Sequence, residues 1–159
     1  MSEVSQETMM FKREPEKLNV AETIKEVYAA LEKKGYEQAT PVQGGAIPYF
    51  MEYKDVIAKA PTGTGKTFAF GIPMVEHADP QGTQVTGLVL APTRELAIQI
   101  EESFLAYGKH LPLRCAVIFG GVGQNPQVEA LGRGVDILVA TPGRLMDLYQ
   151  QGFVKLDQL

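Results

Sequence analysis

One glycine-rich run limits the folds open to this chain more than any other feature. It reads APTGTGKT over residues 60–67 and follows an apolar run at 55–60. Glycines let the backbone curl so that successive N–H groups converge on phosphate oxygens, and a helix N-terminus behind them adds a favourable dipole. Gly-Lys-Thr between a strand and a helix is typical of a phosphate-binding loop, whereas an ordinary strand-to-helix turn is the plainer alternative.

Each part of this loop has an expected role. Lys66 would reach the β- and γ-phosphates of a nucleotide, and the Thr67 hydroxyl would ligate Mg²⁺. The first glycine of the general pattern is replaced by Ala60. The residues expected to surround the phosphates are Thr62, Gly63, Thr64, Gly65, Lys66 and Thr67.

Around the loop, short apolar runs alternate with segments long enough to be helices. The expected strands are Asp55–Ala60, Thr86–Ala91, Arg114–Gly120 and Val135–Ala140, and the expected helices are Lys66–His77, Arg94–His110, Asn125–Gly132 and Pro142–Gln151. Strands that are apolar without alternation are typical of a sheet covered by helices on both faces. The pattern predicts an α/β fold of three layers with a mainly parallel sheet, joined by crossover helices.

The N-terminal part has weaker patterns. We expect a loose leader over residues 1–17 and an amphipathic helix starting after Asn19, with apolar positions at helical spacing up to Leu31. Pro41 is expected to open a second short helix that runs to Ile47. The stretch at 79–82 is interpreted as a surface loop, so that residues 18–159 form a single, partial domain.

Composition limits the possible partners and the compartment. The chain has 159 residues, 45% of them hydrophobic, and a net charge of −4. Broad nucleic-acid binding rests on neutralising many phosphates, so any such contact here must be local. The single cysteine, Cys115, lies in an apolar run and is expected to be a buried thiol in a reducing compartment. Without an apolar run of ~20 residues, a soluble cytoplasmic protein without membrane contact is expected.

Several motifs in fixed order make the chain, from about residue 18 to its end, similar to the DEAD-box RNA helicases. The first is the Q motif at 35–43, which includes Tyr36 and Thr40 and ends at Gln43. The resemblance implies a RecA-like domain that binds ATP and Mg²⁺, with Gln43 reading adenine. A glutamine amide can pair with N6 and N7 of adenine at once. Leu18 stands where the family has an aromatic residue that stacks on adenine.

Three further motifs follow expected strands and resemble the motifs Ia, GG and Ib of that family. Because the carboxyl ends of parallel strands meet at one edge of the sheet, these turns should line one rim. The resemblance implies that the rim binds the backbone of single-stranded or duplex RNA through hydroxyls, backbone N–H groups and guanidiniums. The residues concerned are Pro92, Thr93, Arg94, Gly120, Gly121, Thr141, Pro142, Gly143 and Arg144.

The family's carboxylate box is missing from the sequence. The chain has no Asp-Glu dipeptide, and its serines, at positions 2, 5 and 103, exclude a Ser-Ala-Thr motif. We therefore expect a sheet that is incomplete at the C-terminal end, a parent protein with a second RecA-like domain, and a chain that alone neither hydrolyses ATP nor unwinds a duplex. Glu95 is expected to cap its helix or to form a local salt bridge, and not to replace the missing carboxylates.

Two other kinds of protein remain as alternatives. A small-molecule kinase shares the Gly-Lys-Thr loop, but it normally has a lid rich in arginine, and no such segment occurs here. A non-catalytic interaction protein that keeps a nucleotide as a structural ligand would explain the missing acids.

Overall fold

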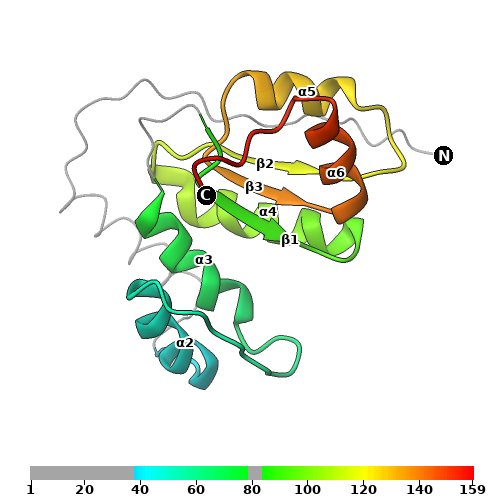
Figure 1. The fold of residues 1–159 in the computed structure, drawn as a ribbon. Helices are drawn as coiled ribbons and strands as arrows, with labels where there is room; N and C mark the ends of the chain where they lie inside the picture. The colour runs from blue at the N-terminus through cyan, green and yellow to red at the C-terminus, as the bar shows by residue number, and fades with distance from the viewer. Residues whose placement is uncertain (1–37, 79–83) are drawn as a thin grey trace.

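The structure is a computed structural model that describes residues 38–78 and 84–159 (Figure 1). Leu18, Tyr36, the expected leader, the expected first helix and the loop at 79–82 lie outside the described residues. The elements are α2 (Pro41–Met51), α3 (Lys66–His77), β1 (Gly87–Leu90), α4 (Arg94–Tyr107), the 3₁₀ helix η1 (Gly108–His110), β2 (Cys115–Ile118), α5 (Asn125–Gly132), β3 (Ile137–Ala140) and α6 (Pro142–Gln150). Among the described residues, no helix is long and apolar enough to cross a membrane.

The three strands form a parallel sheet in the order β1-β3-β2, so β3 lies in the centre. Leu90 and Ile118 both pair with Ala140, which brings the three carboxyl ends to the same edge. The arrows in Figure 1 accordingly point to one side of the molecule. The prediction of an α/β fold with a parallel sheet is confirmed.

Helices cover both faces of the sheet (Figure 1). On one face, Ile137 and Val139 of β3 form a buried cluster with residues of α4 that include Phe104. On the other face, Leu138 and Ala140 belong to a second cluster, to which α5 and α6 contribute. All four residues of β3 are at most 1% exposed. Burial on both faces explains why this strand has no alternation of apolar and polar residues.

A buried ion pair joins the amino ends of β2 and β3. The carboxylate of Asp136, which is fully buried, accepts hydrogen bonds from the backbone N–H, Nε and Nη2 of Arg114 at 2.7, 3.1 and 2.6 Å. Gly134 has a φ of +89°, and a Cβ there would come within 2.3 Å of Nη1 of Arg114. Glycine at this position therefore allows both the turn and the close approach of the guanidinium.

The strand expected at 55–60 does not form. This segment has no regular secondary structure, and Ile57 is fully exposed. No backbone–backbone hydrogen bond to Val56, Ile57 or Ala58 is present among the described residues. A strand needs a neighbour to pair with, and none of the strands in the described part of the chain lies beside this segment. Its apolar composition is typical of a strand, but composition alone does not supply the backbone hydrogen bonds of a neighbouring strand.

The helices agree closely with expectation. The bounds of α3 and α5 are those expected from the sequence, and α6 ends at Gln150, one residue early. The helix that begins at Pro41 runs to Met51 instead of Ile47, with Pro48 inside it. A proline inside a helix removes one N–H donor, but it does not always end a helix whose other groups remain bonded.

Candidate functional site

The glycine-rich loop opens directly onto α3. Gly63 and Gly65 have φ values of +81° and +86°, the left-handed region that glycine adopts at little cost. The Thr64 hydroxyl donates to the Pro61 carbonyl at 2.7 Å and so closes the turn. Within the described residues, no backbone–backbone hydrogen bond uses the N–H groups of residues 62–65. Free N–H groups in front of a helix N-terminus can hold an anion.

The ammonium of Lys66 is folded onto the loop. It donates to the carbonyl oxygens of Ala60 and Pro61 at 2.5 and 2.8 Å. Because these bonds come from a long and rotatable side chain, a phosphate group above the loop would compete with the two carbonyls for the same ammonium. Thr67, the next residue of α3, is half-buried.

Gln43 connects α2 to the loop. Its side-chain oxygen accepts from the N–H of Thr40 at 3.0 Å, and its Nε2 donates to the carbonyl of Gly65 at 3.2 Å. A Cβ on Gly65 would come within 2.3 Å of Nε2, so this glycine is needed for the contact as well as for the turn. Gln43 is only 8% exposed. The amide expected to read adenine is thus engaged inside the protein.

The described residues supply few ligands for a metal. No group of three His, Cys, Asp or Glu side chains within 38–78 and 84–159 is placed to hold a metal ion. Mg²⁺ usually keeps several waters and binds through one or two protein oxygens together with phosphates. Thr67, next to Lys66 at the start of α3, carries a hydroxyl oxygen, which is the type of ligand that such a site takes.

The turns after the three strands lie along one rim, as expected. The N–H of Ala91 donates to the carbonyl of Ala140 at 2.9 Å, and the N–H of Thr141 donates to the carbonyl of Ile118 at 3.0 Å. The backbone of the central strand therefore fixes where both neighbouring turns begin. This brings the starts of α4 and α6 together with the two glycines after β2.

The turn after β1 presents an exposed arginine. Thr93 caps α4, and its hydroxyl oxygen accepts from the N–H of Leu96 at 3.3 Å. The guanidinium of Arg94 lies over the ring of Phe119, 4.6 Å from its centre. A cation–π contact of this kind orients the guanidinium and leaves its donors at the surface. Pro92 and Glu95 are also exposed, and Glu95 lies in the first turn of α4, where the helix dipole favours a carboxylate.

The turn after β2 holds the exposed pair Gly120 and Gly121. Gly121 has a φ of +82°, although a Cβ would meet nothing within 4 Å, so the backbone conformation requires glycine here. Gln127 of α5 accepts from the N–H of Phe119 at 3.3 Å and donates to its carbonyl at 3.1 Å. Gln127 is a functional residue that none of the sequence motifs includes. Its signal was a polar residue three positions from Ala130 on the buried side of α5.

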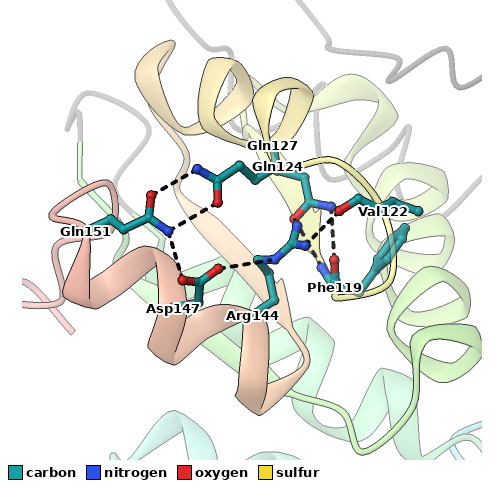
Figure 2. Close-up of polar contacts among 7 residues, drawn as sticks. All are labelled: Phe119, Val122, Gln124, Gln127, Arg144, Asp147 and Gln151. Atoms are coloured by element: carbon teal, nitrogen blue, oxygen red, sulfur yellow. Dashed lines mark hydrogen bonds and ion pairs between the residues drawn. The ribbon is translucent and has the colours of Figure 1, made fainter.

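The turn after β3 begins α6. Thr141 is the N-cap, and Pro142 and Gly143 in the first turn are exposed. Arg144 differs from expectation, because its side chain is only 10% exposed. Its Nη1 donates to the side-chain oxygen of Gln127 at 2.9 Å, and its Nη2 donates to the carbonyl of Val122 at 2.8 Å (Figure 2). The guanidinium therefore faces the turn after β2 instead of the surface.

Burial changes the acidity of two groups on the α4 face of the sheet. Burial raises the pKa of Glu101 to about 7, against a smaller lowering by a backbone hydrogen bond from Val117. The Cys115 side chain is half-buried instead of fully buried as the sequence predicted, but desolvation still raises the pKa of its thiol, which disfavours the reactive thiolate. Neither side chain belongs to the loop or to the rim.

Comparisons with known proteins agree with this geometry. The sequence model of the DEAD/DEAH box helicases matches residues 40–159, which is most of the chain. The chain therefore belongs to the DEAD/DEAH box helicase family.

Individual proteins of this family are similar to the chain in sequence. The chain is 45% identical over 130 residues to the ATP-dependent RNA helicase CshA of Limosilactobacillus reuteri, covering 82% of this chain and 26% of that protein. It is 43% identical over 134 residues to the DEAD-box ATP-dependent RNA helicase CshA of Geobacillus kaustophilus, covering 84% and 29%. The chain thus spans about a quarter of the length of the curated relatives it matches.

Solved structures show the same fold. A DEAD box protein from the hyperthermophile Methanococcus jannaschii superposes with a TM-score of 0.79 at 34% identity, over 90% of this chain and 38% of that one. A hypothetical ATP-dependent RNA helicase from Sulfolobus tokodaii gives 0.76 at 33% identity, over 85% and 39%. The RecA-like fold class expected from the resemblance is confirmed.

Proposed function

We propose that this chain is the ATP-binding and RNA-backbone-binding part of an ATP-dependent RNA helicase. The observation that carries the proposal is the loop at 60–67, in which two glycines of positive φ place Lys66 and free N–H groups at the head of α3. The family match supports it, and the relatives are named RNA helicases. The comparisons give no support to a small-molecule kinase or to a non-catalytic interaction protein.

In this proposal the loop binds the phosphates of ATP or ADP. Lys66 leaves the carbonyls of Ala60 and Pro61 to meet the β- and γ-phosphates, and Thr67 ligates Mg²⁺. The rim formed by the turns after β1, β2 and β3 takes the backbone of RNA. The full-length protein adds a second RecA-like domain, works in the cytoplasm, and couples ATP hydrolysis to the unwinding of RNA duplexes.

Adenine selection by Gln43 is also proposed, and it requires a change in the contacts of its amide. The side chain would have to release Thr40 or Gly65, or bind the base with the second hydrogen of Nε2. Guanine carries O6 where adenine carries an amino group, so an amide in one fixed orientation distinguishes the two bases. Gln43→Ala should therefore narrow the preference for ATP over GTP in a titration of both nucleotides. Equal binding of ATP and GTP by the unaltered chain would contradict the assignment.

The main test is nucleotide binding by calorimetry in the presence of Mg²⁺. Lys66→Ala should weaken ATP binding about tenfold or more, because one charge-assisted contact with phosphate is lost. Lys59→Ala is the matched control, since Lys59 is an exposed lysine just before the loop, and it should bind ATP like the unaltered chain. Equal affinity of the Lys66 variant and the unaltered chain would refute the phosphate-binding assignment.

A further inference from the structure

The buried guanidinium of Arg144 is the centre of a polar network that joins α6, α5 and the turn after β2. Besides Gln127 and Val122, it lies near Asp147, whose carboxylate oxygen is 3.9 Å from Nε of Arg144. The other oxygen of Asp147 accepts from Gln151 at 2.8 Å (Figure 2). Gln151 in turn exchanges two hydrogen bonds with Gln124, at 2.9 and 3.1 Å.

Side chains of this network form hydrogen bonds to the turn after β2 at three places. Gln127 holds both backbone groups of Phe119 at the start of the turn. Arg144 holds the carbonyl of Val122 in the middle, and Gln151 holds Gln124 at the end. The two exposed glycines, at 120 and 121, lie between the first two of these fixed points. Their own positions make no demand on side-chain space, so the flanking bonds decide where their N–H groups lie.

The same turn also supports Arg94. Its guanidinium rests on the ring of Phe119, and the backbone of Phe119 is held by Gln127. Gln127 in turn uses its side-chain oxygen for both the N–H of Phe119 and Nη1 of Arg144. A displacement of Arg144 would therefore reach Arg94 through Gln127 and Phe119.

We propose that Arg144 is a positioning residue of the RNA-binding rim, and that it holds the turn at 119–124 in place from inside instead of contacting a phosphate. This rests on the proposed function, since it takes the rim to be the RNA surface. The guanidinium suits the task because its planar fork reaches two acceptors in fixed directions, which a lysine ammonium cannot reproduce. Arg94, by contrast, is the arginine of the rim that meets RNA phosphates.

The dependence of RNA affinity on salt separates the two roles. The slope of log affinity against log salt follows the number of neutralised phosphates. Arg144→Lys should lower the affinity of the chain for oligo-uridine about tenfold and leave this slope unchanged, because no phosphate contact is lost. Arg94→Ala should lower the slope by about one. A retained affinity in Arg144→Lys, or a slope that falls as it does in Arg94→Ala, would overturn the proposal.

A second variant covers the case in which Arg144→Lys folds poorly. Gln127→Ala leaves Arg144 in place but removes its link to Phe119, so it should lower RNA affinity to a similar extent, again with an unchanged slope. Adding Arg144→Lys to Gln127→Ala should cause little further loss, because both act through one turn. If the fold-losses of RNA affinity in the two single variants multiply in the double variant, Arg144 affects RNA binding independently of Gln127, and the proposal is contradicted.

A measurement without RNA keeps this proposal distinct from the proposed function. Amide hydrogen exchange of residues 119–124 in the RNA-free chain should become faster in Arg144→Lys, while exchange in β3 stays the same. If the unaltered chain binds no RNA at all, the proposed function fails, and exchange still decides whether Arg144 positions the turn. Unchanged exchange at 119–124 in Arg144→Lys would refute the positioning role, whatever the RNA result.

Discussion

Two regions of this molecule contain similar apolar segments with opposite fates. In β2, Ala116-Val117-Ile118 lies in the sheet, and Ile118 is completely buried. Before the glycine-rich loop, Val56-Ile57-Ala58 stays outside any sheet, and Ile57 is completely exposed beside an open groove of about 530 Å³. The side chains are nearly the same in the two segments. The difference lies in the backbone, because β2 pairs with β3 and residues 56–58 have no such partner in the described part of the chain.

Hydrophobicity makes a segment able to enter a core but does not place it there. A buried backbone must have its N–H and C=O groups bonded, and in a sheet only a neighbouring strand can do this. The region from 84 to 159 meets that condition and has two packed clusters. The region from 38 to 65 is held instead by the packing of α2 against α3, where Ala46 is buried, and by polar contacts of Gln43, Lys66 and Tyr53.

The largest effect should follow from breaking the ion pair at the base of the sheet. Arg114→Ala leaves the fully buried carboxylate of Asp136 without its main partner, so we expect a loss of about 3–5 kcal/mol in the free energy of unfolding by urea. Arg133→Ala is the control. Its ion pair with Glu129 is 3.7 Å long and exposed at both ends, and its loss should cost under about 0.5 kcal/mol. Similar losses of unfolding free energy in both variants would mean that the buried ion pair stabilises the fold no more than the exposed one does.

A matched pair of isoleucines tests the comparison directly. Ile118→Ala should lower the free energy of unfolding by about 2–5 kcal/mol, because it removes buried methyl groups and leaves a cavity. Ile57→Ala makes the same chemical change at an exposed position and should stay within about 0.5 kcal/mol. A large loss in the Ile57 variant would show that residues 56–58 are buried in solution, for example by association of two chains. Sedimentation would then reveal the association.

A smaller effect should appear as pH dependence within the sheet region. The pKa of Glu101 is raised in the folded state from 4.5 to about 7, mainly by burial. The folded chain thus holds a proton that the unfolded chain releases, so the stability from this group is complete below pH 4.5 and is lost as pH rises towards 7. Glu101→Gln should remove this decline and stabilise the chain at pH 8 by on the order of 1–3 kcal/mol. The exposed neighbour variant Glu102→Gln should retain most of the decline, and an equal decline in both variants would contradict the assignment.

The smallest effect concerns the contacts that hold the loop region. The Tyr53 hydroxyl lies 3.0 Å from Nδ1 of His77, and the two rings are stacked with centres 4.2 Å apart. Tyr53 is 80% exposed, so Tyr53→Phe should change the free energy of unfolding by less than about 0.5 kcal/mol. A loss above about 1 kcal/mol would mean that the loop region is held as firmly as the sheet.

Most of the fold could be predicted from the sequence because its signals are local. The Gly-Lys-Thr run marks the start of α3, and the Thr-Pro-Gly run marks the start of α6. The parallel order follows from strands separated by helical segments. The strand predicted at 55–60 does not form, because an apolar segment becomes a strand only if another strand pairs with it. Local sequence signals do not show whether such a partner exists, and the prediction was wrong for that reason.

The site was less predictable than the fold. The sequence indicates which side chains have suitable chemistry, and it correctly gathers three turns on one rim. It does not indicate which way a side chain faces, and Gln43 and Arg144 both turn inward to bond neighbouring loops. Gln127 was missed because a glutamine on a helix carries no motif. Contacts of this kind depend on the distance between elements, which only the packed structure provides.

The bonds at the end of β3 have a geometric consequence for whatever lies on the rim. Two consecutive residues, Ala140 and Thr141, bond through backbone atoms alone to Ala91, which follows β1, and to Ile118, the last residue of β2. The turns therefore follow one another at the spacing of neighbouring strands, about 4.8 Å, whichever side chains they carry. Side-chain substitutions on the rim can change its charge and its contacts with a ligand without changing this spacing. A change in ligand binding by such a variant can therefore be assigned to the side chain that was changed, and not to a shift of the turns.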